Sequence, residues 1–440
     1  MHLIFENLIP NLVSLWTGKF KDFPPSDDFV FSPPSIWDAI TEASHQSSKT
    51  IPSAYGAPVP NIKTQRSHMT AETWSFWAIF VGPVVLRRRF KRKVFYDHFI
   101  TLVKLIRTCL KLEYTAQDIE DIDSGFNAWV QEFERLYYKG DPSRLSCCTL
   151  ALHALLHIAH DIRQAGPVWV YWAFAMERYC GRLQSAIKSR RFPWSNLDHF
   201  IEIDSLLSLV KYNHHLDIGD TLDISPQSHH GRRVMEKRNT AYPDYTLHSP
   251  SEVRAITKSQ QTNIARHLST RYGIALSVAR RVIPMTLEHW GKLRISNGGD
   301  LIHAHHVVKR PRDGRDASFV RYEDWVDRHA RNHRADPDFV AKDFWGQLLN
   351  IFVLNIDDSG AYLLGEHSSR RTFFLTEVRR CKIVSKDVLG NMYYREMGTV
   401  DVVDLESIQC VVGRIYDRKE WAIVDRSDPL AHASFHVSSQ

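Results

Sequence analysis

Apolar residues recur every three or four positions through much of the first half of the chain, a pattern typical of helices with one buried face. The clearest segment begins at Thr115, which forms a capping-box-like start with Asp118, and it ends at Gly140. Residues 23–70 are rich in Pro, Ser and Asp and are predicted to be mostly loop. The spacing predicts further helices over residues 1–16, 72–86, 97–112, 149–164 and 172–190.

The pattern changes after about residue 340. Short β-rich runs there are separated by polar turns, and they cover Phe344–Ile356, Thr372–Val384, Val400–Val403, Ile408–Ile415 and Trp421–Val424. Runs of this length without intervening helices predict a small barrel or sandwich. Before them, residues 217–250 are polar, and residues 251–295 are basic and predicted to be helical. We therefore expect an α+β fold in three parts: a mostly α region (1–215), a basic, partly disordered connector (216–340) and a small all-β, barrel-like domain (341–430).

The composition is that of a globular protein, with 43% hydrophobic and 24% charged residues among 440. The longest apolar run, Ala78 to Leu86, is too short to span a bilayer, so no membrane partner is expected. Residues 1–16 lack the basic start of a secretory signal. The six Cys include no Cys-x-x-Cys pair, which favours a reducing compartment over a disulfide framework.

Positive charge is concentrated in two places. Residues 251–316 hold 12 Lys and Arg against 5 Asp and Glu, a local balance of +7 in a chain of net charge +6. Clustered cations suit a polyanion such as DNA, and a solvated face is the alternative that the charge pattern alone leaves open. The second concentration, which we call the basic segment, spans residues 87–93 and consists of Arg87, Arg88, Arg89, Phe90, Lys91, Arg92 and Lys93.

His153 and His157 are four residues apart, so one helix face would carry both imidazoles, a spacing that can place them on one zinc ion. Glu177 follows an aromatic stretch, where a carboxylate is costly to bury without a cation or a metal. On spacing alone, structural histidines and a surface glutamate paired with an arginine are the simpler interpretations. A second histidine cluster is interpreted as a polar loop: His303, His305 and His306.

The stretch from His153 to Arg191 resembles the last block of the catalytic domain in CACTA-type DNA transposases, which have an Asp-Asp-Glu active site. In that family a His-x-x-x-His pair precedes a Gly-Pro turn and an aromatic run that ends in Glu-Arg-Tyr/Phe-x-Gly. Gly166 follows His157 by nine residues and precedes Glu177 by eleven, as in the more distant V(D)J recombinase catalytic subunit. The resemblance implies that Glu177 matches the third acid and that His153 and His157 match paired zinc ligands.

The resemblance covers nearly the whole chain. The motifs Ile-Pro-Ser-Ala-Tyr-Gly (51–56), Thr-Trp-Ser-Phe-Trp (73–77) and Tyr-Asp-His-Phe (96–99) are similar to the helical insertion of an RNase H-like transposase domain in the fungal members. Phe-Trp-Gly-Gln-Leu (344–348) and Trp-Ala-Ile-Val-Asp-Arg (421–426) are similar to their C-terminal β module. The family's DNA path implies phosphate contacts for Lys188, Arg190 and Arg191, with a helix C-terminus favoured by positive charge as the alternative.

The resemblance also implies that His2 is the motif histidine that follows the second catalytic Asp. Both catalytic Asp and two zinc-ligand Cys are then expected outside this sequence. Because such a site needs three carboxylates to hold two Mg²⁺ or Mn²⁺ ions, we expect a transposase fragment that binds DNA and does not cleave it alone.

Two alternatives remain open: a co-opted, non-catalytic DNA- or chromatin-binding scaffold, and an unrelated zinc hydrolase that uses His153, His157 and Glu177. The expected partners are double-stranded DNA and a second copy or a full-length transposase. The expected cofactors are Zn²⁺ and, only if the missing acids are supplied, Mg²⁺ or Mn²⁺. The expected compartment is the nucleus, with the cytoplasm as the alternative.

Overall fold

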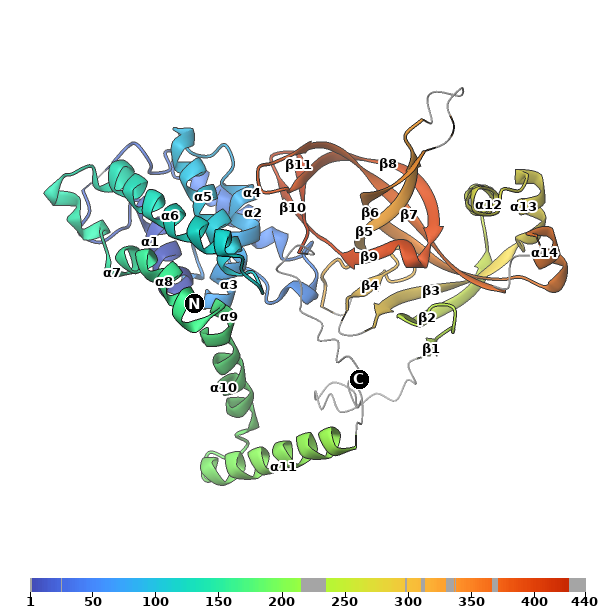
Figure 1. Cartoon of the computed structure of the whole chain (residues 1–440), viewed down its shortest axis with the longest axis horizontal. Coiled ribbons are helices and arrows are strands. Elements are labelled where there is room, and N and C mark those ends of the chain that lie inside the picture. The colour runs from blue at the N-terminus through green and yellow to red at the C-terminus, as the bar shows by residue number, and fades with distance from the viewer. Residues whose placement is uncertain are drawn as a thin grey trace. The chain divides into compact units, whose positions relative to one another are not determined.

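The computed structural model describes residues 2–24, 26–214, 235–296, 299–309, 313–329, 336, 338–365 and 371–426. The chain divides into two compact units (Figure 1). The small unit comprises residues 168–233, of which 168–214 are described. The main unit comprises the remaining described residues on both sides of it. Each unit is described by itself below.

Residues 2–165 of the main unit are mostly helical, as the spacing of apolar residues predicts. The helices are η1 (His2–Leu8), α1 (Ile9–Trp16), α2 (Ser35–Ser47), η2 (Ser53–Tyr55), η3 (Arg66–His68), α3 (Ala71–Phe76), η4 (Trp77–Val81), α4 (Gly82–Val85), α5 (Lys93–Cys109), α6 (Ala116–Phe133), η5 (Glu134–Tyr138), η6 (Pro142–Cys147), α7 (Leu150–His153), η7 (Ala154–His157) and α8 (Ile158–Ala165).

Helix α6 begins as predicted. The Oγ1 atom of Thr115 accepts the N–H of Asp118 at 3.1 Å, and Asp118 Oδ2 accepts the N–H of Thr115 at 3.0 Å, which completes the capping box. A Cβ atom added at Gly125 would lie 2.4 Å from Leu105 Cδ2, so glycine permits the close approach of α5 to α6. The buried face of α6 carries Ile122, Phe126, Trp129, Val130 and Phe133.

Large aromatic rings form the centre of the helical region. Trp16 is 1% exposed, packs edge-on against Phe99 with ring centroids 5.5 Å apart, and donates its Nε1–H to the Tyr137 hydroxyl at 3.0 Å. Trp77 is fully buried and donates to Ser44 Oγ at 3.1 Å. Buried aromatic side chains contribute much of the stability of a core, and their polar atoms here are satisfied.

The structure differs from the sequence expectation in two helical segments. Helix α2 lies within residues 23–70, which were predicted to be mostly loop; it buries Trp37, Ile40 and Ser44 against its neighbours. The single helix predicted over 149–164 is divided into α7, a short 3-10 turn (η7) and α8. In both places tertiary packing outweighs the local composition.

An antiparallel sheet of 11 strands, curled into a half-barrel, forms the rest of the main unit (Figure 1). Its main path runs β1-β2-β3-β6-β7-β8-β11-β10, and β4, β5 and β9 branch from it. The strands are β1 (Glu236–Lys237), β2 (Tyr245–Ala255), β3 (Thr286–Ile295), β4 (Leu301–His303), β5 (Phe319–Asp327), β6 (Phe339–Asn355), β7 (Thr372–Lys386), β8 (Met392–Asp404), β9 (Ile408–Val411), β10 (Gly413–Asp417) and β11 (Glu420–Val424). The accompanying helices are α12 (Lys258–Tyr272), α13 (Leu276–Val282), α14 (Asp358–Leu363) and η8 (Leu405–Ser407).

The five predicted β-rich runs all coincide with strands, although Ile356 lies just past β6 and the run Ile408–Ile415 is divided between β9 and β10. The sheet, however, begins earlier than residue 341. Strands β2 and β3 and the helix pair α12–α13 lie within 216–340, where a connector was expected, and β3 pairs directly with β6. The helical prediction over 251–295 holds for α12 and α13 and is wrong for the flanking strands. Strand pairing depends on partners distant in sequence, which local periodicity does not reveal.

The helical region is hydrogen-bonded to the sheet. The hydroxyl of Tyr55 lies 3.1 Å from the carbonyl oxygen of Val411 and 2.9 Å from that of Val424. The guanidinium of Arg315 donates to three main-chain carbonyls of one loop, those of Ile51, Pro52 and Gly56, at 2.7, 3.0 and 2.7 Å. These contacts explain why the helices and the sheet form one compact unit.

The described part of the small unit, residues 168–214, contains three helices: α9 (Val168–Tyr171), α10 (Phe174–Ala186) and α11 (Pro193–Asn213). None of its described residues is buried.

The observed fold is α+β, with a helical N-terminal region and a half-barrel at the C-terminal end, which confirms the expected order of these two parts. None of the helices described in either unit has an apolar stretch long enough to cross a bilayer.

Candidate nucleic-acid interface and metal-ligand residues

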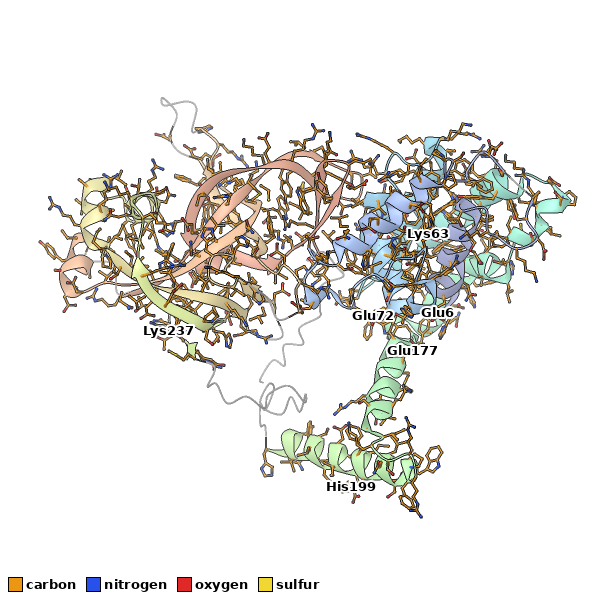
Figure 2. The ribbon with its side chains drawn as sticks, turned by 180° about the vertical axis from the view of Figure 1, so that it is seen from behind. Glu6, Lys63, Glu72, Glu177, His199 and Lys237 are labelled. Carbon is orange, nitrogen blue, oxygen red and sulfur yellow. The ribbon has the colours of Figure 1, made fainter. Side chains whose placement is uncertain are left out.

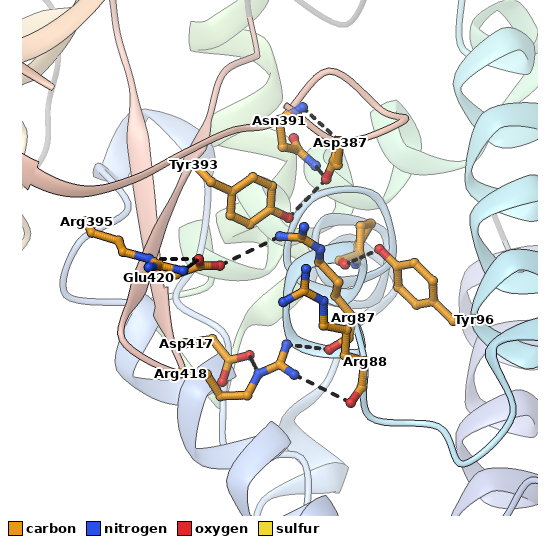
Figure 3. Close-up of polar contacts among 11 residues, drawn as sticks. Arg87, Arg88, Tyr96, Asp387, Asn391, Tyr393, Arg395, Asp417, Arg418 and Glu420 are labelled. Atoms are coloured by element: carbon orange, nitrogen blue, oxygen red, sulfur yellow. Dashed lines mark hydrogen bonds and ion pairs between the residues drawn. The ribbon is translucent and has the colours of Figure 1, made fainter. Parts of the chain in front are cut away.

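Two arginines of the basic segment form contacts inside the main unit. Arg89 lies 2.5 Å from Asp417 Oδ1, and both side chains are largely buried. The guanidinium of Arg87 stacks over Tyr393 at 4.3 Å from the ring centroid and lies 3.9 Å from a carboxylate oxygen of Glu420 (Figure 3). These two cations therefore join the helical region to strands β8, β10 and β11.

Arg418, in the turn between β10 and β11, strengthens the same junction (Figure 3). Its guanidinium donates to the main-chain carbonyls of Arg87 and Arg88. Arg88 has a φ of +56°, a left-handed conformation that places this bend of the backbone against the sheet. A hydrogen bond from Arg395 lowers the pKa of Glu420, and the charges of Arg87 and Arg88 lower it further.

The remaining cations predicted to bind DNA in this segment are Arg88, Lys91 and Arg92, and all three are exposed. Arg92 lies 3.9 Å from Asp28 and 5.7 Å from the ring centroid of Phe95. The structure therefore divides the basic segment into a buried structural part and an exposed part. Phosphate contact remains a prediction for the exposed part.

The second basic region folds into the helix pair α12–α13. Thr257 and Gln260 form a capping box at the start of α12, and Gly273 ends the helix with a φ of +63°. The buried faces of both helices join a core cluster that includes Phe352 of β6 and Phe373 of β7. The apolar residues that the pair contributes to this cluster include Ile264, Ala265, Leu268, Ala279 and Val282.

The outer surface of α12–α13 carries cations without acids. Lys258, Arg266, Arg280 and Arg281 are exposed, and none forms an ion pair with a described residue. No Asp or Glu occurs between Glu252 and Glu288. Arg271 is the exception among the cations, because it pairs with Asp404. Four exposed cations thus lie on a helix pair that packs against the sheet.

The two predicted zinc-ligand histidines lie side by side in the main unit. His153 and His157 are exposed, and their Nε2 atoms are 3.2 Å apart. In a tetrahedral zinc site with nitrogen ligands at about 2.0–2.1 Å, two ligand atoms lie about 3.3 Å apart. The pair therefore has the spacing of two zinc ligands, although the chain between them is a 3-10 turn rather than a regular helix.

Further zinc ligands are not evident near this pair. No group of three or more His, Cys, Asp or Glu side chains able to hold a metal occurs among the described residues. Burial raises the pKa of the Cys147 thiol to about 12, and burial also raises the pKa of Cys148. Neither cysteine forms such a group with the two histidines.

Glu177 and the three cations that follow it lie in the small unit. Glu177 is exposed in the first turn of α10 (Figure 2). Lys188, Arg190 and Arg191 are exposed between α10 and α11, where Asn196 Oδ1 accepts the main-chain N–H of Lys188 at 3.1 Å. This turn presents three cations, and phosphate contact remains a prediction for them.

His2, the predicted motif histidine, lies in η1 of the main unit. Its Nδ1 atom contacts the carboxylate of Glu6 one turn later, and its side chain is 58% exposed. This contact is local to one turn of helix.

The structure also reveals a polar cluster that the sequence analysis did not assign to a site. Asn350 and Glu377 lie opposite each other on β6 and β7, and both are almost fully buried. Asn350 Nδ2 donates to Glu377 Oε2 at 2.5 Å and lies 3.1 Å from the Nδ1 atom of His306. The available signal was a lone Asn in the apolar run Leu-Leu-Asn-Ile-Phe-Val and a Thr-Glu pair in the apolar run Phe-Phe-Leu-Thr-Glu-Val.

Comparison with known proteins identifies no relative of this chain: no family model, no curated protein and no solved structure matches it.

Proposed function

We propose that this chain is a DNA-binding protein of the CACTA transposase type that contacts double-stranded DNA through helices α12 and α13. The observation that carries the proposal is the exposed surface of these helices, where four cations face solvent and the local sequence contains no acid. Lys and Arg contacts to phosphates supply most of the affinity of sequence-independent DNA binding.

The helix pair is a better candidate than the basic segment because its cations are uncommitted. In the basic segment, Arg87 and Arg89 contact Glu420 and Asp417. On α12–α13, Lys258, Arg266 and Arg280 have no acidic partner among the described residues. A cation already paired with a carboxylate gains less from a phosphate, since one attraction replaces another. Arg88, Lys91 and Arg92 would extend the binding surface rather than form its centre.

The transposase part of the proposal rests on the sequence block from His153 to Arg191. In an RNase H-like transposase domain Glu177 would hold a divalent metal, and His153 and His157 would hold zinc. The 3.2 Å separation of the two Nε2 atoms supports the zinc assignment. One carboxylate does not bind the two metal ions of this chemistry, so the proposed activity is binding and not strand cleavage. A DNA-binding chain of this type would act in the nucleus.

Fluorescence anisotropy with a labelled, blunt duplex tests the proposal. The full chain should bind at low salt, with an affinity that falls steeply as salt is added. The double variant Arg280→Gln/Arg281→Gln should weaken binding and reduce the slope of log affinity against log salt by about 2, roughly one for each lost phosphate contact.

The double variant Lys19→Gln/Lys21→Gln provides the matched control, because it removes two exposed cations from another part of the main unit. It should leave the salt slope unchanged. Absence of duplex binding at low salt would overturn the proposal. Equal slopes for the two double variants would remove α12–α13 from it.

A co-opted scaffold is the second candidate, and the fold supplies an observation in its favour. The DNA-binding helices are mounted on the core of the sheet in the main unit, whereas Glu177 lies in the small unit. Glu177→Gln should therefore leave duplex affinity unchanged. In a transposase that assembles its active site with another chain, the same variant should abolish metal-dependent cleavage when that chain is added, whereas a scaffold would show no cleavage with either form.

A further inference from the structure

An open cavity of about 500 Å³ lies between the start of α12, strands β3 and β6, and the loop that follows β4. Its walls include Arg254, His289, His305, His306, Lys309 and Asn350. No acidic side chain lines it, although two permanent cations do. The volume is in the range of sites that bind small molecules.

His289 differs from the other residues of this cavity in its burial and its hydrogen bonding. It is 1% exposed, and neither ring nitrogen makes a hydrogen bond of normal geometry with a described residue, although the Asn350 side chain lies close enough to raise its pKa slightly. Its ring packs edge-on against Phe352, with centroids 4.8 Å apart. A buried imidazole without a well-formed hydrogen bond is costly, and a bound water or ligand is one way in which such a group is satisfied. Burial, together with the charge of Arg254, lowers the pKa of His289 to about 4, so at neutral pH the ring is uncharged and offers one N–H donor.

A network behind His289 fixes the polar wall. The pairing of β6 with β7 shifts register between Leu348 and Asn350, an irregularity of the kind that redirects a side chain next to a site. Asn350 Nδ2 then donates to Glu377 Oε2, and Asn350 Oδ1 accepts from Arg254 at 3.1 Å. Gln260 Nε2 also donates to Glu377 Oε2, at 3.1 Å. The buried carboxylate is therefore occupied by two amides and holds the wall in place.

The loop after β4 brings the remaining groups. The main-chain N–H groups of His305 and His306 donate to the carbonyls of Leu348 and Leu349 at 2.9 and 3.0 Å, which ties the loop to β6. Lys309 follows at the exposed rim of the cavity. The sequence interpretation of these histidines as a polar loop describes their backbone and misses the cavity that they line.

We propose that this cavity binds a phosphate ester, with Lys309 supplying positive charge and His289 a buried N–H donor, while Arg254 is already paired with Glu252 at 3.3 Å. Oxyanions accept several hydrogen bonds at once, and charge-assisted bonds to them are strong. The cavity is larger than a phosphate group alone, so the phosphate would carry an organic substituent such as a nucleoside. Either a free nucleotide or the phosphorylated end of a DNA strand could supply it. This site adjoins the start of α12. It is distinguished from the proposed duplex-binding surface by its ligand and by the variants that test it.

Isothermal titration calorimetry with the full chain tests the site, using thymidine 5′-monophosphate and, as the chemical control, thymidine. The monophosphate should bind and thymidine should not. Lys309→Gln should weaken monophosphate binding about tenfold, the loss expected for one charge-assisted hydrogen bond. Lys342→Gln, which removes an exposed lysine on β6 outside the cavity, should leave the affinity unchanged. Equal binding of thymidine and the monophosphate would overturn the proposal, and so would an unaltered affinity in Lys309→Gln.

His289→Phe removes the buried donor while keeping an aromatic ring against Phe352, and it should weaken binding at least as much as Lys309→Gln. If this variant fails to fold, the comparison of Lys309→Gln with Lys342→Gln still decides whether the cavity binds the phosphate.

A 5′-phosphorylated and a 5′-hydroxyl oligonucleotide distinguish the two possible sources of the phosphate, a free nucleotide and the end of a DNA strand. If the phosphorylated strand binds more tightly than both the 5′-hydroxyl strand and the free monophosphate, the site is assigned to strand ends. If the two strands bind equally while the monophosphate still binds, the site is assigned to free nucleotides. Arg280→Gln/Arg281→Gln should leave monophosphate binding unchanged, which separates failure of this proposal from failure of the duplex-binding proposal.

Discussion

The two units of this chain contain similar proportions of apolar residues in their helices but differ in what those residues contact. In the main unit, α5 and α6 bury Phe99, Trp129 and many neighbours. In the small unit, α10 and α11 carry Met176, Trp194 and Leu206 at exposures of 64%, 75% and 55%. The described side chains of the small unit include no buried one. The comparison separates helix formation, which is local, from stabilisation by burial, which is not.

Helix α11 shows the difference most clearly. Its apolar residues, which include Trp194, Ile201, Ile203, Leu207 and Val210, are distributed around the helix instead of along one face. Helices of this kind are normally buried inside larger structures. The apolar side chains of the main unit are buried by other described residues, whereas those of the small unit are not. The following predictions test that contrast, beginning with the largest expected effect.

Replacement of a central aromatic residue in the main unit should have the largest effect. Trp77→Ala should lower the free energy of unfolding by about 3–5 kcal/mol, because it removes a fully buried ring and leaves a cavity. It also removes the hydrogen bond that Ser44 Oγ accepts from the indole, while Ser44 still donates to the Ile40 carbonyl. Chemical denaturation of the full chain measures the loss. A decrease below 1 kcal/mol would mean that Trp77 does not lie in a packed core.

Breaking the junction between the helical region and the sheet should have the next largest effect. Asp417→Ala leaves Arg89, whose side chain is only 14% exposed, without its carboxylate, and it also removes the ion pair of Arg418 with Asp417. We expect a loss of about 3 kcal/mol, typical of a buried charge that loses its partner. The double variant Arg89→Ala/Asp417→Ala should lose less than the sum of the single variants. Additivity in denaturation experiments would show that the two side chains do not interact.

The stability of the main unit should also depend on pH. Burial lowers the pKa of His98 and of His267 to about 4, from the usual 6.5. Below pH 6.5 the two histidines bind protons in the unfolded chain but stay neutral in the folded chain. The free energy of unfolding is therefore greatest above pH 6.5 and falls as the pH decreases towards 4. Each imidazole should contribute about 2 kcal/mol of this loss by pH 4.5. His267→Gln should make the pH dependence shallower, and an unchanged profile would contradict the assignment.

Substitution of an exposed ring in the small unit should have the smallest effect. Trp194→Ala, at 75% exposure, should change the free energy of unfolding by no more than about 0.5 kcal/mol. Trypsin should cleave after Arg190 or Arg191 before it cleaves the main unit, because segments with few buried contacts open most readily. Protection of this turn, or a loss above 1 kcal/mol in Trp194→Ala, would show that α11 is covered in solution and would remove the contrast between the units.

Much of the secondary structure could be predicted because its cause is local. The capping box at Thr115 and the regular spacing of Ile122, Phe126 and Trp129 determine α6 without reference to the rest of the chain. The β-rich runs after residue 340 coincide with strands, one of them with two short strands instead of one. The strands within 216–340 could not be located in this way, because β2 and β3 are stabilised by pairing with each other and with β6.

The candidate sites follow the same division. The i, i+4 spacing of His153 and His157 was enough to predict that the imidazoles would meet. By contrast, the sequence treated the cations of residues 87–93 as equivalent, and only the structure separates the paired Arg89 from the exposed Lys91. His289, Asn350 and His306 lie far apart in sequence, and sheet pairing brings them to one cavity.

The sequence by itself determined the helical first half, the β-rich last part, the histidine pair and the acid-free stretch between Glu252 and Glu288. Each of these depends on residues within a few positions of one another, through helix periodicity, capping or local charge. The tertiary structure decided which cations are free, where the sheet begins and which polar residues share a cavity. Those properties depend on burial and on contacts between distant segments, and a side chain's environment is defined only when the chain has folded.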